Sequence, residues 1–202
     1  MRDIASVDGA VVEEEPVLGA KKSGLGTMMT GGNPDGERGR EKRDFYPSPP
    51  EITRALLAVE TFSHSIWEPA CGDDAIVNVL EAHGHKVLGT DIHPLGKGKR
   101  ADFFAVTPRK VSNIITNPPF DLAVEFIEHA MKFEPDKVAF VFKSSFWQAA
   151  GRQPLFQRHK PARIYPLTWR PDFMGLGRPT MEVMWCVWER GYVGEPPPTF
   201  PC

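Results

Sequence analysis

The sequence predicts an α/β domain with a mostly parallel sheet and helices on both faces. Apolar runs of strand length alternate with segments of helical periodicity, which is the pattern of a parallel sheet. A turn containing Gly72 follows the first run, and Asp91 ends the second run about twenty positions later. The continuous apolar run at 138–142 indicates a strand buried on both faces. The length of 202 residues suits one domain, because single domains extend to roughly 250 residues.

Composition argues against several classes of protein. The net charge of −2 speaks against a surface covered uniformly with nucleic-acid-binding charge, but it allows a local basic face. Cys71, Cys186 and Cys202 are too few and too scattered for a disulfide framework or a zinc site, so no metal is predicted and a reducing cytoplasm is expected. We find neither a signal-peptide core nor an uncharged run of about 18 residues, so a soluble protein without a membrane segment is expected.

Three regions of the chain differ in composition. Residues 1–43 are predicted to be a flexible N-terminal tail, because their glycines, prolines and charges cannot bury enough apolar surface to offset the entropy of ordering. The basic end of this tail, at 38–43, either contacts nucleic acid or is a solvated linker. Residues 44–190 are predicted to form the folded domain. Residues 191–202, which contain consecutive prolines, are predicted to be a short extended tail.

The first predicted helix covers 52–59. Ser48 and Glu51 have the spacing of a capping box, with prolines in the first turn between them. Phe45 and Tyr46 precede this cap, where they either form a hydrophobic staple or line a ligand pocket. The elements expected next are a strand at 65–67, a helix at 75–83 and a strand at 86–92.

The second half of the domain continues with a strand at 111–116. Asp121 is placed to cap the following helix, whose apolar side is predicted to be buried. Trp185 and Trp188 are interpreted as core residues. The remaining elements expected are a strand at 137–142, a short helix ending near 159, and strands at 163–167 and 181–188.

Asn117, Pro118, Pro119 and Phe120 form an unusual end to the strand at 111–116. The prolines cannot continue a sheet ladder, and they restrict the backbone so that the Asn117 side chain and the Pro118 carbonyl are held rigidly. Such a corner can present two acceptors to one amino group, while Phe120 offers a face for stacking. The alternative is a strand end with a purely structural role.

Several polar residues are predicted to gather at one edge of the sheet. In a parallel α/β fold, ligands bind outside the carboxyl ends of the strands. The turn after the first strand, Asp91, the pair Asp102 and Phe103, and Asn117 would all lie there. A carboxylate at the end of the second strand can accept hydrogen bonds from both hydroxyls of a ribose. The turn lacks the further glycines of the dinucleotide fingerprint, so a pyrophosphate or NAD site is not predicted.

The order of these motifs resembles the amino-methylating DNA methyltransferases, in particular the N6-adenine enzymes and their small phage-type members. The resemblance covers roughly residues 44–190. It implies a Rossmann-like class I methyltransferase fold with a seven-stranded sheet, whose last two strands form an antiparallel hairpin, and S-adenosylmethionine as the cofactor. The motifs that carry it are Phe45–Pro49, Glu68–Gly72, Asp91, Asp102–Phe103 and Asn117–Phe120.

The resemblance also implies a set of cofactor-binding residues. Phe45 and Tyr46 would close over the methionine part of the cofactor, with the turn after the first strand beneath it. Asp91 would accept the ribose hydroxyls, and Asp102 would bond the adenine amino group, with Phe103 near that ring. The full implied set is Phe45, Tyr46, Glu68, Ala70, Gly72, Asp91, Ile92, Asp102, Phe103 and Asn117.

The implied catalytic residues are Asn117, Pro118, Pro119 and Phe120. Asn117 and Pro118 would accept the two hydrogens of the target amino group, and Phe120 would stack on a base flipped out of its duplex. Asp74 departs from the resemblance, because a small residue is usual at its position. Its carboxylate would either cap the following helix or crowd the cofactor site.

Basic and aromatic residues in the second half are candidates for nucleic-acid contacts. Lys143 and Arg152 either grip phosphates or belong to a solvated surface, and the loop before the last strand is suited to face the target base. The predicted nucleic-acid-binding residues are Lys143, Arg152, Trp169, Arg170 and Arg178.

The hypothesis from sequence is an S-adenosylmethionine-dependent DNA adenine N6-methyltransferase. It would act as a monomer or homodimer in the cytoplasm of a bacterial or phage-infected cell. The alternatives are a methyltransferase for guanine N2 in ribosomal RNA or for a glutamine amide in protein, and a nucleic-acid-binding relative that has lost cofactor binding through Asp74.

Overall fold

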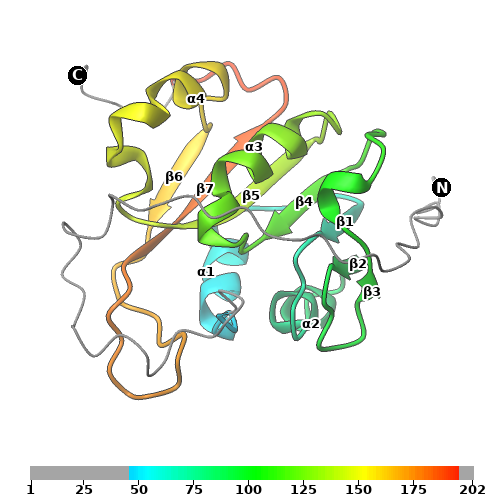
Figure 1. Cartoon of the computed structure of the whole chain (residues 1–202), viewed down its shortest axis with the longest axis vertical. Helices are drawn as coiled ribbons and strands as arrows, with labels where there is room; N and C mark the ends of the chain where they lie inside the picture. Colours follow the sequence, from blue (N-terminus) through cyan, green and yellow to red (C-terminus); the bar gives the residue numbers. More distant parts are fainter. Residues whose placement is uncertain (1–45, 196–202) are drawn as a thin grey trace, which may run out of the picture.

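The computed structural model describes residues 46–195, which form a seven-stranded sheet flanked by helices (Figure 1). The predicted N-terminal tail, Phe45 and the last residues of the predicted C-terminal tail lie outside this range. No helix within the described range is long and apolar enough to cross a bilayer.

The elements follow the predicted order, with small shifts at their ends. The α-helices are α1 (Pro50–Val59), α2 (Ala75–Ala82), α3 (Ala123–Met131) and α4 (Gln153–Arg158). The strands are β1 (Ser65–Glu68), β2 (Lys86–Asp91), β3 (Lys99–Arg100), β4 (Asn113–Thr116), β5 (Lys137–Lys143), β6 (Arg163–Pro166) and β7 (Val183–Glu189). Short 3-10 helices lie at Phe103–Ala105 (η1), Phe120–Leu122 (η2), Phe146–Gln148 (η3) and Ala150–Arg152 (η4).

The strand order is β3-β2-β1-β4-β5-β7-β6. Strands β1 to β5 run parallel, and β7 is antiparallel to both β5 and β6. This confirms the predicted mostly parallel sheet with an antiparallel last hairpin. The register pairs Lys143, at the end of β5, with Val183, at the start of β7. The connection from β6 to β7 therefore leaves the sheet at the same edge as the carboxyl ends of the parallel strands.

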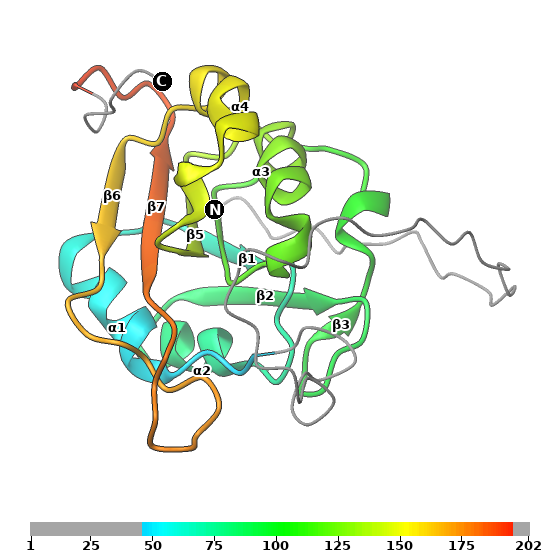
Figure 2. The same ribbon diagram turned by 60° about the vertical axis from the view of Figure 1, so that its left-hand side comes forward.

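Each face of the sheet carries its own apolar core. Ile114 and Ile115 are adjacent in β4 and point to opposite faces, since side chains alternate along a strand. The core on one side includes Phe126 of α3, and the core on the other side includes Leu56 of α1 and Leu80 of α2. Figure 2 shows α3 and α4 across the sheet from α1 and α2. The prediction of helices on both faces is confirmed.

The tryptophans of β7 belong to both cores. Trp185 packs on the side of α1, and Trp188 packs on the side of α3. Both were interpreted as core residues from sequence, and their exposed fractions of 1% and 6% confirm this. The Trp185 indole N–H donates to the carbonyl of Ile52 at 2.8 Å, so burial leaves no donor unpaired there.

Two predicted helix caps are wrong. Pro49 is the N-cap of α1, and no side chain accepts a hydrogen bond there, so Ser48 is not part of a capping box. Asp121 lies within the turn η2, and the N-cap of α3 is Leu122, without a side-chain hydrogen bond. Pro50 opens α1 and has no N–H to be capped, and Pro119 precedes η2 and fixes the backbone there.

A buried carboxylate lies at the edge of the sheet where the parallel strands begin, opposite the edge that carries the predicted motifs. Glu60 follows α1 and is 5% exposed. Lys137 at the start of β5 donates to it at 2.7 Å, Tyr165 donates at 2.9 Å, and Arg163 of β6 donates through two nitrogens. Burial alone would raise the pKa of Glu60, but these hydrogen bonds outweigh it and lower the pKa below its ordinary value.

Candidate active site

The turn after β1 is joined to the end of β2. The Cys71 N–H donates to the carbonyl of Thr90 at 3.0 Å, and the Gly72 N–H donates to Asp91 Oδ2 at 2.9 Å. Gly72 has a φ of +51°, a conformation that glycine adopts without strain. The other oxygen of Asp91 accepts from the N–H of His93 at 2.7 Å. Each carboxylate oxygen has a second lone pair, so Asp91 is held in place and can still accept from a ligand.

Glu68 ends β1 as a buried carboxyl group beneath this turn. It is 2% exposed, and its Oε2 has no hydrogen-bond partner among the described residues. Burial, and then the nearby charge of Asp74, raise the pKa of Glu68 well above its ordinary value. The acid is therefore stabilised in its protonated form until a cationic group comes near it.

Asp74 binds the loop that follows β2. It is buried, has a φ of +66°, and accepts a hydrogen bond from the N–H of Lys97 through Oδ2. The N–H groups of Leu95 and Gly96 both donate to the carbonyl of Gly72, at 2.9 and 3.2 Å. We call residues 95–98 the latch loop, because it fastens onto the glycine turn.

The latch loop depends on its own glycines. A Cβ at Gly96 would lie 2.0 Å from Asp74 Oδ2, and a Cβ at Gly98 would lie 2.2 Å from the sulfur of Cys71. Of the two alternatives for Asp74, a side-chain cap of α2 is not observed. Asp74 occupies the N-cap position, but its carboxylate faces the latch loop, and Asp73 accepts from the Ala75 N–H at 3.2 Å. Asp74 is thus a structural tie, and its charge still raises the pKa of Glu68.

Asp102 lies beside Asp91 at the edge of the sheet. The Ala101 N–H donates to the carbonyl of Asp91 at 2.9 Å, which brings the next residue to the end of β2. Asp102 Oδ1 accepts from the N–H of Phe104 at 2.9 Å and so starts η1. A carboxylate oxygen can accept more than one hydrogen bond, so Asp102 can also accept from a ligand. Ile92, on the other side of Asp91 in sequence, is 52% exposed.

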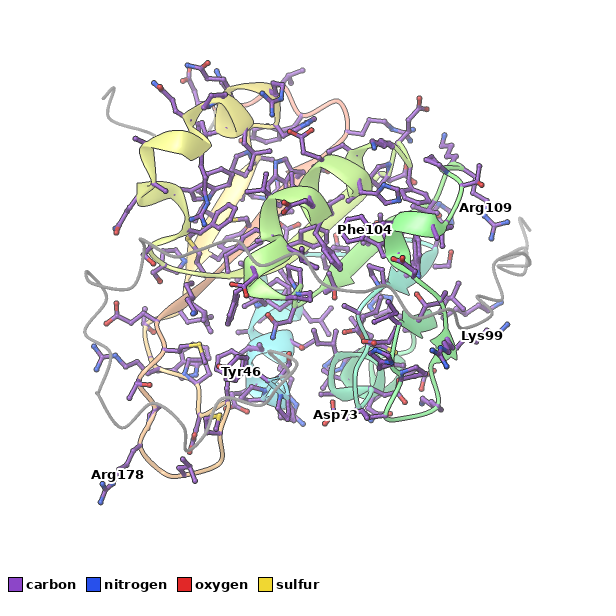
Figure 3. The ribbon with its side chains drawn as sticks, viewed as in Figure 1. Tyr46, Asp73, Lys99, Phe104, Arg109 and Arg178 are labelled. Atoms are coloured by element: carbon purple, nitrogen blue, oxygen red, sulfur yellow. The ribbon has the colours of Figure 1, made fainter. Side chains whose placement is uncertain are left out.

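The aromatic residue predicted to lie near the adenine, Phe103, is buried, and the exposed ring is that of the next residue, Phe104. Phe103 is 3% exposed and is packed in the core against Trp67 and Phe126, with ring centroids 5.3 and 4.7 Å away. Phe103 therefore offers little surface to a ligand, and its place near a bound adenine stays a prediction. Phe104 is 39% exposed and lies on Phe126, at 5.2 Å between centroids (Figure 3). Of the two rings, Phe104 is the one available to a ligand.

The Asn117 carboxamide is held in one orientation after β4. Its Nδ2 donates to the hydroxyl of Ser48 at 3.1 Å, and its Oδ1 has no hydrogen-bond partner among the described residues. Ser48 is 7% exposed and Pro118 is also buried. The amide nitrogen is thus engaged by the segment before α1, and the acceptor oxygen is left unpaired.

The Phe120 ring lies close to two other predicted site residues, Tyr46 and Lys143. The ring of Tyr46 is 6.0 Å away between centroids, with 34° between the planes. The ammonium of Lys143, at the end of β5, lies 4.5 Å from the centroid of Phe120. The structure therefore brings Tyr46, Phe120 and Lys143 together, from three separate segments of the chain, next to Asn117.

The remaining predicted nucleic-acid-binding residues are distributed differently. Arg152 donates to the carbonyl of Phe146 at 2.5 Å and lies 4.3 Å from the centroid of that ring, so its guanidinium is engaged within the protein. Arg170 forms an ion pair with Glu182 at 2.5 Å. Trp169 and Arg178 are exposed in the connection from β6 to β7, and Arg178 points away from the body of the protein (Figure 3).

Three contributors to this site were not predicted from sequence. Ser48 was assigned to a helix cap, Phe104 was overshadowed by its neighbour, and the latch loop had no assigned role. Glycines at 96 and 98 flanking a lysine were a visible signal, because closely spaced glycines often mark a close approach of backbone segments.

Comparison by sequence finds no matching family model and no matching curated protein. Solved structures do match. A Pyrococcus horikoshii protein assigned as an RNA methyltransferase has a TM-score of 0.58 and 15% identity, with 73% of this chain and 88% of that chain covered. A Listeria monocytogenes protein assigned as a class I S-adenosylmethionine-dependent methyltransferase has a TM-score of 0.56 and 16% identity, over 81% and 66% of the two chains.

A third similar structure is a dimethyladenosine transferase from Plasmodium falciparum, with a TM-score of 0.51, 10% identity and coverage of 72% of this chain and 63% of that chain. At such identities the likeness concerns the fold. The chain has the Rossmann-like fold of class I methyltransferases, as the resemblance of its motifs implied.

Proposed function

We propose that this protein transfers a methyl group from S-adenosylmethionine to the exocyclic N6 amino group of an adenine in DNA. The observation that carries this proposal is the Asn117 carboxamide, whose nitrogen is held by Ser48 while its oxygen has no partner among the described residues. An unpaired buried acceptor is costly, by about 1–3 kcal/mol, unless a ligand satisfies it. An amino group is a donor that fits.

Asn117 meets a specific chemical need of an aromatic amine. The lone pair of such a nitrogen is delocalised into the ring, so the amine is a poor nucleophile. Acceptors that draw its N–H bonds favour a pyramidal nitrogen, whose lone pair can then point toward an electrophile. The amide oxygen of Asn117 is one acceptor, and the carbonyl of Pro118 is the proposed second, held by the rigid proline corner.

The residues at the ends of β1 and β2 fit the proposed cofactor. Glu68 has an unpaired buried oxygen that can meet the ammonium group of a methionine moiety, and Asp91 has lone pairs left for ribose hydroxyls. Asp102 and Phe104 would hold the adenine. When bound, S-adenosylmethionine would supply a methyl group whose bond to the positive sulfur breaks as the bond to nitrogen forms, with one amino proton released.

Tyr46, Phe120 and Lys143 suit a base that has left its duplex. An extruded base is commonly held between aromatic side chains, and a cation beside them can meet the adjoining phosphate. Lys143 lies over the Phe120 ring in the free protein, so a stacking base would displace it. The choice of DNA and of adenine rests on the resemblance of the whole motif series from Phe45 to Phe120. The motif Asn117–Phe120 by itself fits any planar amino group, including guanine in RNA or a glutamine amide. Among the structural neighbours, names that mention RNA make RNA the first competitor to test.

The decisive experiment offers labelled S-adenosylmethionine together with DNA, RNA or protein. We expect label in DNA, recovered as N6-methyladenine after digestion to nucleosides. Asn117→Ala should lower transfer by about 100-fold or more in folded protein. Asn78→Ala, which changes an exposed asparagine on α2, is the matched control and should transfer normally.

Other outcomes would overturn parts of the proposal. Label only in RNA or protein would contradict the DNA substrate while leaving the amino-methyltransferase chemistry in place. Failure to bind S-adenosylmethionine by calorimetry would contradict the enzyme altogether and favour a nucleic-acid-binding relative.

A further inference from the structure

The connection from β6 to β7, residues 167–182, begins and ends at the edge that carries Asn117. The Leu167 N–H donates to the carbonyl of Val183 at 3.1 Å, which closes the base of this loop. The Ser144 N–H donates to the carbonyl of Glu182 at 2.9 Å, which ties the base to the end of β5 beside Lys143. We call residues 167–182 the β6–β7 loop. It projects beyond the sheet, in orange in Figures 1 and 2.

The β6–β7 loop has an anchored root. Phe173 is 4% exposed and packs in the core on the side of α1. Asp172 accepts hydrogen bonds from the N–H groups of Met174 and Gly177, at 3.3 and 2.6 Å. Its pKa is lowered, chiefly by the N–H of Gly177. The carboxylate of Asp172 is thus engaged by backbone N–H groups of the loop itself. The turn that follows is set by these bonds and by positive φ values at Gly175 and Gly177.

The tip of the loop presents apolar side chains to solvent. Leu176 is 71% exposed, Met174 is 44% exposed, and Trp169 nearer the base is 41% exposed. A turn organised by a carboxylate holds Leu176 outward, although its burial would stabilise the protein by about 1.5–3 kcal/mol. A contiguous apolar tip of this kind is typical of a surface that a partner covers.

The charges around the tip favour nucleic acid as that partner. Arg178 makes no hydrogen bond or ion pair within residues 46–195 and extends into solvent in Figure 3. Lys143 lies at the same edge. Arg170 is paired with Glu182, so Arg178 and Lys143 are the cations that can face a phosphate. Cationic side chains around an exposed apolar side chain are typical of proteins that insert that side chain between stacked bases and bind the neighbouring phosphates.

We propose that Leu176, supported by Met174, is a wedge that enters the base stack of a double-stranded nucleic acid next to the target nucleotide, with Arg178 contacting a backbone phosphate. This inference rests on the proposed function and narrows its substrate to duplexes. Removing a base from a duplex costs a few kcal/mol of pairing and stacking, and an apolar side chain in the gap offsets part of that cost. A single strand has no such cost.

The test compares wild type and Leu176→Ala on the same genomic DNA, in native and in heat-denatured form. We expect methylation of native DNA to fall by about tenfold or more, because the cost of extrusion is no longer offset. Methylation of denatured DNA should change less than about twofold. Val59→Ala, an exposed apolar residue on α1, should match wild type on both forms. An equal loss on the two forms, or no loss on either, would overturn the wedge.

Arg178→Met provides a separate measurement. Loss of one phosphate contact should reduce the slope of log affinity against log salt by about one unit on native DNA. An unchanged slope would overturn the phosphate contact.

Failure of the proposed function remains distinguishable from failure of the wedge. If wild type methylates neither form of DNA, the proposed function fails, and binding then tests the wedge. Weaker binding of native DNA by Leu176→Ala, with unchanged binding of denatured DNA, would support the wedge. Equal binding of both forms by wild type and variant would overturn it.

Discussion

The two edges of the sheet differ in whether their buried polar side chains are hydrogen-bonded. At the edge with Glu60, the buried carboxylate is satisfied by Lys137, Arg163 and Tyr165. At the edge with Asn117, the amide oxygen of that residue and Oε2 of Glu68 have no partner among the described residues. Hydrogen-bonded buried polar groups stabilise a fold, whereas a buried group without a partner is costly and can be satisfied by a ligand. The contrast indicates which edge binds ligands and which maintains the structure.

The largest expected effect comes from breaking the saturated edge. Glu60→Ala removes the buried acceptor shared by Arg163, Lys137 and Tyr165, while Glu189 still pairs with both cations. The loss should therefore lie at the lower end of the roughly 3–5 kcal/mol that removal of one member of a buried ion pair costs. Urea unfolding measures this loss. Glu128→Ala is the matched control, because Glu128 pairs with the exposed Arg158 and should cost only about 0–1 kcal/mol. Equal losses in the two variants would contradict the contrast between the edges.

The stability of the protein at acid pH should also depend on Glu60. Because the folded state lowers the pKa of Glu60 below its unfolded value of 4.5, its stabilisation is present above that pH and is lost as the pH falls through the folded pKa. Wild type should therefore lose stability below about pH 4.5, and Glu60→Ala should lose less over the same range. Parallel pH profiles would show that other groups dominate acid unfolding.

Asn117→Ala should affect chemistry while leaving the fold intact. It removes an acceptor that is unpaired before the substrate binds, so transfer should fall by about 100-fold or more, as when a single stabilising hydrogen-bond partner is lost from a transition state. Asn117→Asp keeps acceptor oxygens and should retain more activity than the alanine variant. The measurement is kcat, with the urea midpoint as a check. A fall in kcat that only follows loss of folded protein would contradict the assignment.

Gly96→Ala tests whether the latch loop shapes the cofactor end of the site. The added methyl group would collide with Asp74, and overpacking of this kind costs about 1–3 kcal/mol. Calorimetry should show weaker S-adenosylmethionine binding, because the loop bonds the carbonyl of Gly72. Gly151→Ala, where a Cβ meets open space, should leave binding and stability near wild type. Normal binding by Gly96→Ala would separate the latch loop from the cofactor site.

Ser48→Ala has the smallest expected effect. Loss of one neutral hydrogen bond, worth about 0.5–1.5 kcal/mol, should free the Asn117 amide to rotate and lower kcat by up to about tenfold. The KM for the cofactor should stay unchanged, and Ser48→Thr, which keeps the hydroxyl, should restore kcat. A rise in KM with normal kcat would place Ser48 at the cofactor instead.

Local patterns in the sequence were sufficient for every strand except the two-residue β3, and for placing Glu68, Gly72, Asp91 and Asn117 at strand ends along one edge. Strand ends of a parallel sheet meet at one edge whatever the details of packing, so residues placed just after apolar runs are brought together. The same logic failed for Phe103 and Phe104, because two consecutive rings on a short 3-10 turn face different ways. Both rings contact Phe126, and only the further packing of Phe103 against Trp67 and Phe133 makes it the buried one.

The sequence by itself determined the succession of strands along the chain and the residue types at their ends, because apolar periodicity and proline stereochemistry act over a few residues. The tertiary structure decided which polar atoms are paired. Ser48 and Asn117 are 69 positions apart, and Asp74 and Lys97 are 23 apart, so no local pattern links them. A hydrogen bond between such residues exists only after the sheet has assembled. For that reason the unpaired oxygen of Asn117, on which the proposed function depends, could be found only in the folded chain.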